Sequence, residues 1–124
     1  MSVLIDTSVW VDHFRNHNAA LVRLLHQDRV LTHPMVLLEI ACGTPPAPRP
    51  QTLRNLGLLQ SCPEASWGEL LEFIERERLH GLGCGLVDIA LLASAVLRPS
   101  TELWTLDRRL QQLAQRFGVA HQPV

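Results

Sequence analysis

Four carboxylates in this sequence stand where an acid is costly. Asp6 ends the apolar run that opens the chain, and Asp107 comes directly after "LWTL". Glu39 is the one charged residue in "PMVLLEIAC", and Asp88 is the one charged residue in "LGCGLVDIALLASAVL". Burying an ionised carboxylate without a partner costs several kcal/mol. The other acids mostly stand among charged residues, as in "EFIERER", so solvent exposure explains them.

Each of the four acids also has an ordinary structural explanation. Asp107 can serve as a helix N-cap, and Asp88 in a first helical turn gains from the helix dipole. Glu39 can pair with a buried arginine. Asp6 points more strongly to a site, because open parallel sheets bind ligands at the carboxyl ends of their strands.

The joint pattern of the four acids points to a cation. Two of them follow strands and two lie on apolar helices, so all four can converge at one edge of a sheet. Ionised carboxylates share a site only when a cation neutralises their repulsion. Oxygen-only ligation favours Mg²⁺ or Mn²⁺ over zinc.

The elements that would carry these acids alternate between short strands and helices, which is typical of a parallel sheet covered on both faces. Pro34 suits the first position of a helix, and the run "GTPPAPRPQ" predicts a stiff loop with no helix. Strands are expected over residues 3–6, 29–34 and 102–106. Helices are expected from Thr7 or Ser8 and over residues 18–26, 34–42, 51–60, 66–80, 87–97 and 107–117.

The segment "SWGELLEFIERERLHG" gives the clearest helix signal. Ser66 and Glu69 have the spacing of a capping box. The periodicity predicts an inward-facing stripe, which consists of Trp67, Leu70, Leu71 and Ile74. The helix over residues 87–97 is apolar nearly all round and is therefore expected to be central and buried.

The composition fits one soluble domain. The chain has 124 residues, of which 47% are hydrophobic and 19% charged. Its first apolar run is too short for a secretory or membrane segment, so we expect a cytoplasmic protein that does not associate with a membrane. The three cysteines, Cys42, Cys62 and Cys84, lack a CxxC pair and are interpreted as small buried hydrophobes.

Four segments carry a family resemblance. "LIDTSVWVDHFR", "EIACG", "GLVDIALLASA" and "LWTLDRRLQQLA", in that order, resemble the PIN-domain ribonucleases, especially the VapC toxins of toxin–antitoxin modules. The resemblance implies one PIN domain over residues 1–124, an α/β fold with a central, mostly parallel sheet flanked by helices. It also implies that Asp6, Glu39, Asp88 and Asp107 form an acidic quartet for Mg²⁺ or Mn²⁺, with Asp6 and Asp88 as direct ligands.

The resemblance also implies a reaction. A cation held by the quartet would polarise a water and a phosphate oxygen, and a second ion could stabilise the leaving oxygen. The substrate would be tRNA, rRNA or mRNA. Thr7, Ser8 and Thr105 fall where such proteins carry hydroxyls that support the acids, although each also suits a cap or a strand end.

The net charge of −1 at first argues against a nucleic acid partner. Setting the quartet aside leaves eleven arginines against eight acids, a balance of +3. The remaining surface is thus mildly basic. Arg108 and Arg109 flank Asp107 and Arg15 lies one helix beyond Asp6, so these three arginines are candidates for phosphate contacts.

The resemblance further implies partners. We expect a VapB-like antitoxin that places a helix in an apolar groove and a basic side chain in the quartet, giving a toxin–antitoxin hetero-oligomer. The expected groove walls are the helix of Trp10 and Phe14 and the helix of Leu53, Leu56 and Leu59. A homodimer is expected through the helices on the far side of the sheet from "GTPPAPRPQ".

Two other functions remain open from the sequence. A structure-specific DNA nuclease could use the same metal chemistry, but 124 residues leave little room for extra helices that thread a flap. A non-catalytic PIN-fold module that binds RNA or protein would not need an intact quartet. Metal titration followed by a nuclease assay separates these possibilities.

Overall fold

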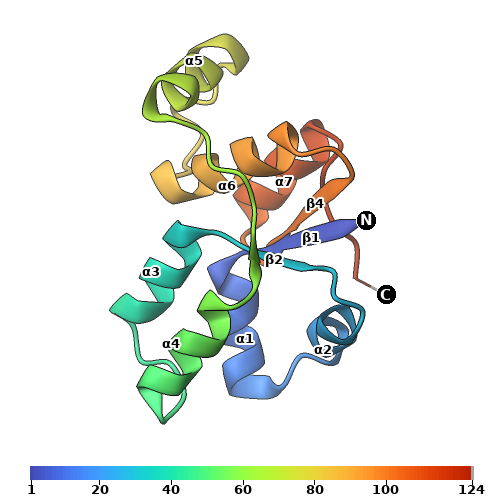
Figure 1. Cartoon of the computed structure of the whole chain (residues 1–124). Coiled ribbons are helices and arrows are strands. Elements are labelled where there is room, and N and C mark those ends of the chain that lie inside the picture. Colours follow the sequence, from blue (N-terminus) through green and yellow to red (C-terminus); the bar gives the residue numbers. More distant parts are fainter. Residues whose placement is uncertain (124) are drawn as a thin grey trace.

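The computed structural model describes residues 1–123, and within them a sheet of four parallel strands has the order β3-β2-β1-β4. This arrangement confirms the α/β fold (Figure 1). The strands are β1 (Ser2–Ile5), β2 (Val30–Thr32), β3 (Gln60–Ser61) and β4 (Thr101–Trp104). The helices are α1 (Thr7–Asn16), α2 (Ala19–His26), α3 (Pro34–Cys42), α4 (Arg49–Gly57), α5 (Trp67–Glu77), α6 (Leu86–Leu97) and α7 (Arg108–Arg116).

Strand β1 lies between β2 and β4, and its three apolar residues Val3–Ile5 are completely buried. The register pairs Ile5 with Trp104, the last residues of two neighbouring strands. The next residue of each strand, Asp6 and Thr105, therefore leaves the sheet at the same edge. Both residues are buried.

Helices cover both faces of the sheet (Figure 1). Helices α6 and α7 lie on one face, and α1 and α2 lie on the other. Helix α3 packs on α1, and α5 packs on α6. As Figure 1 shows, α1 and α6 begin at the carboxyl edge of the sheet. Their first turns are thereby brought close to the ends of β1 and β4.

Local sequence signals explain most helix boundaries. Helix α3 starts with Pro34 at its first position and ends before Gly43, as predicted. Its N-cap, His33, accepts a hydrogen bond from the Met35 N–H through Nδ1 at 3.1 Å. The predicted capping box of α5 is confirmed.

The prediction for residues 43–61 was partly wrong. The proline-rich run is not all loop, because α4 begins at Arg49 and places Pro50 in its first turn, where the missing N–H of proline leaves no hydrogen bond unmade. Residues 60 and 61 are not helical but form β3, parallel to β2. Both β3 residues are exposed, so the sequence has no alternation of apolar and polar residues that would predict this short strand.

The predicted inward stripe of α5 was also partly wrong. Leu70 and Phe73 are buried, whereas Trp67 is 87% exposed and Leu71 is 64% exposed. Helix α5 packs mainly on α6, and its buried face also includes Ile74 and the contact between Phe73 and Phe117. Trp67 and Leu71 lie outside this face.

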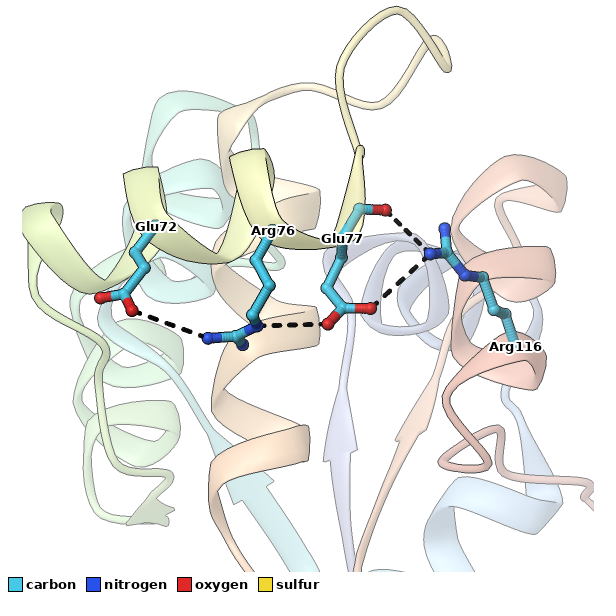
Figure 2. A network of polar contacts seen from close by, with 4 residues as sticks. All are labelled: Glu72, Arg76, Glu77 and Arg116. Carbon is cyan, nitrogen blue, oxygen red and sulfur yellow. Dashed lines mark hydrogen bonds and ion pairs between the residues drawn. The ribbon is translucent and has the colours of Figure 1, made fainter.

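A polar network links the end of α5 to α7 (Figure 2). Arg116 donates a hydrogen bond to the Glu77 carbonyl at 2.8 Å and lies 3.7 Å from its carboxylate. Arg76 bridges Glu72 and Glu77 on α5 itself. These ion pairs are largely exposed, so each contributes little free energy.

The three cysteines are not all buried. Cys62 is buried and Cys84 is half-buried, but Cys42 is exposed at the end of α3, which corrects the prediction for that residue. None of them forms a disulfide. Among residues 1–123, no helix combines the length and the apolar character that crossing a membrane demands.

Candidate functional site

Asp6 is an acid that the local structure does not need as a cap. It occupies the N-cap position of α1, yet its carboxylate accepts no capping hydrogen bond from that helix. Instead, Oδ2 accepts hydrogen bonds from the Ser8 hydroxyl at 2.6 Å and from the Thr105 hydroxyl at 2.7 Å. The residue is only 5% exposed. The carboxylate is thus held by two side-chain hydroxyls rather than by backbone N–H groups of α1.

The same two hydroxyls tie Asp6 to the loop after β4. The Ser8 hydroxyl accepts a hydrogen bond from the Leu106 N–H at 3.0 Å, and the Thr105 hydroxyl accepts one from the Asp107 N–H at 3.0 Å. Each hydroxyl therefore donates to the acid and accepts from the backbone. This pattern fixes the orientation of the Asp6 carboxylate.

Glu39 is held by the third predicted hydroxyl. Thr7, the first residue of α1, donates a hydrogen bond to Glu39 Oε1 at 2.6 Å across the contact between α1 and α3. Glu39 is exposed, however, and so is its neighbour Leu38. The apolar context of "PMVLLEIAC" therefore overstated the burial of this acid, although its approach to the end of β1 is as expected.

Asp107 and Asp88 both occupy helix starts. Asp107 is exposed and caps α7, accepting a hydrogen bond from the Leu110 N–H through Oδ1 at 2.9 Å. Asp88 lies in the first turn of α6, where the Gly85 backbone N–H interacts with its carboxylate. These are the structural roles that the sequence left open for them, and the cap formed by Asp107 uses one of its two carboxylate oxygens.

The charges of three other acids act on Asp88. The pKa of Asp88 is raised above the ordinary value, first by burial and then by the negative charges of Asp6 and Asp107, with a smaller contribution from Glu39. Coulombic effects of this kind require short distances. Acids from three other segments of the chain thus act electrostatically on Asp88 at the start of α6.

The donors in this region fit a hard divalent cation in type and charge. Asp6 Oδ1, Glu39 Oε2 and Asp107 Oδ2 accept no hydrogen bond from the described residues, so each acid retains a free oxygen. As they stand, no three His, Cys, Asp or Glu side chains within residues 1–123 form a group that could hold a metal ion. Mg²⁺ is usually bound by one or two carboxylates together with water and substrate phosphate, so the fit lies in the type of the oxygen donors.

The three candidate arginines differ in their surroundings. Arg15 lines a hollow of about 390 Å³ that also includes Thr7, Glu39 and Pro45. Arg109 donates a long hydrogen bond, 3.4 Å, to the Gly83 carbonyl in the loop before α6. Arg108 is exposed, and within the described part of the chain no hydrogen bond or ion pair connects it to the acids.

A second hollow lies between α1 and α4, as predicted. Its volume is about 330 Å³. Its apolar walls come from Trp10 and Phe14 on one side and from Leu56 and Leu59 on the other. Leu53 packs against the core instead and does not line it, so the expected wall was wrong at that residue.

The interaction of Cys84 with the acids was not predicted from the sequence. Its thiol is half-buried, and its pKa is raised by burial and by the charges of Asp88 and Asp107, with Arg109 acting in the opposite direction. Its position in the loop immediately before α6 was the available signal. The interpretation of Cys84 as a small buried hydrophobe did not include this interaction with the acids.

Comparisons with known proteins agree with this geometry. The family model for the PIN domain matches residues 3–116. Ribonuclease VapC32 from two strains of Mycobacterium tuberculosis is 41% identical over 118 residues, which cover 95% of this chain and 94% of each relative. The chain therefore belongs to the PIN-domain family, with VapC-type ribonucleases among its relatives.

Proposed function

We propose that this protein is the toxin of a toxin–antitoxin pair, an endoribonuclease that depends on Mg²⁺ or Mn²⁺ and acts on cytoplasmic RNA. The observation that carries the proposal is the Asp6 carboxylate, which is 5% exposed after β1 and is held on Oδ2 by the Ser8 and Thr105 hydroxyls. The charges of Asp6, Asp107 and Glu39 also repel the charge of Asp88 and raise its pKa. A fold gains nothing from such repulsion. A bound cation removes the repulsion, and likeness to Ribonuclease VapC32 supports RNA as the substrate.

The chain's own residues divide the work in this proposal. Asp6 and Asp88 hold the cation, and Glu39 and Asp107 orient the surrounding water. Ser8 and Thr105 keep the Asp6 carboxylate in one orientation. A divalent cation bound here supplies charge stabilisation for the phosphate and acidifies an attacking water.

The hollow beside Glu39 offers a path for the RNA strand. It extends from Thr7 and Glu39 at the acids to Arg15 and Pro45. Arg15 is exposed, so its charge is available to a phosphate that lies beyond the cleaved bond. tRNA, rRNA and mRNA all present such a backbone.

The hollow between α1 and α4 suits the antitoxin. A short helix can place apolar side chains between Phe14 and Leu59 in the way that amphipathic helices occupy grooves. A basic residue beyond that helix would then reach Glu39 and the other acids. Its positive charge replaces the cation, which inhibits the enzyme.

The exposed apolar side chains of α5 and α6 suit a homodimer. Trp67, Leu71 and Leu86 are each more than half exposed and line a hollow of about 260 Å³. Exposed apolar patches of this kind mark interaction surfaces. The patch lies away from the proline-rich run, on the side where the sequence led us to expect the dimer contact.

The proposal is tested by nuclease assays on the purified chain. We expect cleavage of RNA with Mg²⁺ or Mn²⁺ and none after treatment with EDTA. Asp88→Asn should lower the rate by about 100-fold or more, because it removes a ligand rather than an outer partner. Glu75→Gln, which removes an exposed acid of α5, should leave the rate unchanged.

The same assay separates the other functions. Cleavage of a matched DNA and not of RNA would indicate a DNA nuclease. RNA binding without cleavage at any metal concentration would indicate a binding module. Full activity of Asp88→Asn would overturn the acidic site itself.

A further inference from the structure

Arg109 lies beside the acids without pairing with them. It is exposed in the first turn of α7, and its charge acts on the Cys84 thiol together with the charges of Asp88 and Asp107. Yet no carboxylate within residues 1–123 lies within ion-pair distance of its guanidinium. Its one hydrogen bond in that range goes to a neutral group, the carbonyl of Gly83. The positive charge of Arg109 is therefore not neutralised by a carboxylate of the described residues.

Gly83 provides the space in which this guanidinium lies. A Cβ atom at position 83 would stand 2.8 Å from Arg109 Cζ and 3.0 Å from Cδ, and closer still to Nη1. The guanidinium thus occupies the volume that any other side chain at position 83 would fill. Gly83 also has a φ of +84°, in the left-handed region that favours glycine.

A charged side chain gains little from the contact with Gly83 alone. A single long hydrogen bond to a carbonyl is weak, and an arginine near several acids gains more by turning toward one of them. The geometry instead keeps the guanidinium against the loop and open to solvent. Such a side chain can accept an anion from outside.

We propose that Gly83 positions Arg109 to bind a backbone phosphate of the RNA next to the cleaved bond. The inference rests on the proposed ribonuclease function, and it names a contact of the substrate on the α6–α7 side of the acids. Arg15 lies on the opposite side, in the hollow beside Glu39. The strand would then be held by an arginine on each side of the acids.

The loop offers a matched control for the test. Gly81 also has a positive φ, +71°, but a Cβ atom there would meet nothing within 4 Å. Gly81→Ala and Gly83→Ala therefore share the backbone strain, and only the second displaces the guanidinium. Because the displaced group is the far end of a flexible side chain, Gly83→Ala moves Arg109 rather than the fold.

The experiment measures binding of a fluorescein-labelled single-stranded RNA in EDTA over a range of salt concentrations, so that no cleavage occurs. Arg109→Gln should weaken binding by roughly fivefold and reduce the slope of log K against log salt by about 0.7, the value for one phosphate contact. Gly83→Ala should reproduce both changes. Gly81→Ala should bind as the unaltered protein does, and the double variant Gly83→Ala with Arg109→Gln should bind no more weakly than Arg109→Gln.

The salt slope distinguishes a phosphate contact from a merely structural role, which would change affinity without changing the slope. An unchanged slope in Arg109→Gln, or equal effects of Gly81→Ala and Gly83→Ala, would overturn the inference. In Mg²⁺, cleavage by Arg109→Gln should show a raised KM with little change in kcat. Absence of cleavage by the unaltered protein would contradict the ribonuclease function, whereas the EDTA binding data would still decide the role of Arg109.

Discussion

At the residue scale, the site depends on how one carboxylate is held. Asp6 receives two hydroxyl hydrogen bonds on a single oxygen, and both hydroxyls are in turn fixed by backbone N–H groups. Outer partners of this kind orient a ligand and determine how well it binds. Ser8 and Thr105 therefore determine the orientation of the Asp6 carboxylate.

The contribution of Thr105 can be measured. Thr105→Val keeps the shape of the side chain but removes a hydrogen bond to Asp6 and one from the Asp107 N–H. We expect a loss of RNA cleavage of about 10- to 100-fold, as for other outer partners. Thr101→Val is the control, because Thr101, at the start of β4, is as buried as Thr105 but its hydroxyl donates only to the Pro99 carbonyl. Equal activity of the two variants would contradict the orienting role.

Asp88 should show the conflict between activity and stability. Its folded pKa is raised, so its charged form lowers stability at neutral pH, and this penalty disappears as the pH falls through that pKa. In EDTA, Asp88→Asn should therefore melt at a higher temperature than the unaltered protein at neutral pH. The difference should vanish in acid. Thermal unfolding followed by circular dichroism decides it, and a lower melting temperature at neutral pH would contradict the repulsion.

At the element scale, helix packing determined what the sequence could predict. The strand ends and helix starts that carry Asp6, Asp88 and Asp107 followed from local signals such as caps and apolar runs. The exposure of Glu39 could not be predicted, because it depends on which side of α3 meets α1. For the same reason, the periodicity of apolar residues in α5 could not predict that Trp67 is exposed.

The cap of α3 makes the fold sensitive to acid. His33 is buried and accepts a hydrogen bond through Nδ1, so it must be neutral there, and burial lowers its pKa below the ordinary 6.5. The unfolded chain therefore takes up protons first, and stability should fall as the pH falls below 6.5. Urea unfolding at pH values above and below 6.5 measures this loss.

A variant isolates the contribution of His33. His33→Asn retains a good capping residue without a titratable ring, so its stability should depend less on pH. Some dependence should remain, because burial and the nearby His17 also lower the pKa of His13. An identical pH dependence in the variant and the unaltered protein would rule out the role of the cap.

At the scale of the whole molecule, the outward apolar surface of α5 and α6 should govern assembly. Leu71→Glu places a charge in the centre of the patch with Trp67 and Leu86, and should convert a dimer into a monomer. Leu58→Glu is the control, because Leu58 is 79% exposed at the end of α4, outside the patch. Light scattering after gel filtration gives the mass, and a dimer that survives Leu71→Glu would place the contact elsewhere.

The pairing of the first strand with the last has a consequence for synthesis. Asp6 is made before the Thr105 hydroxyl that holds it, which is 99 residues away, and Asp107 follows still later. Strand β1 cannot take its place between β2 and β4 until β4 exists. A nascent chain on the ribosome thus lacks a complete site, and any product truncated before Thr105 should be harmless to the RNA around it. The site can therefore form only after Thr105 and Asp107 have been made.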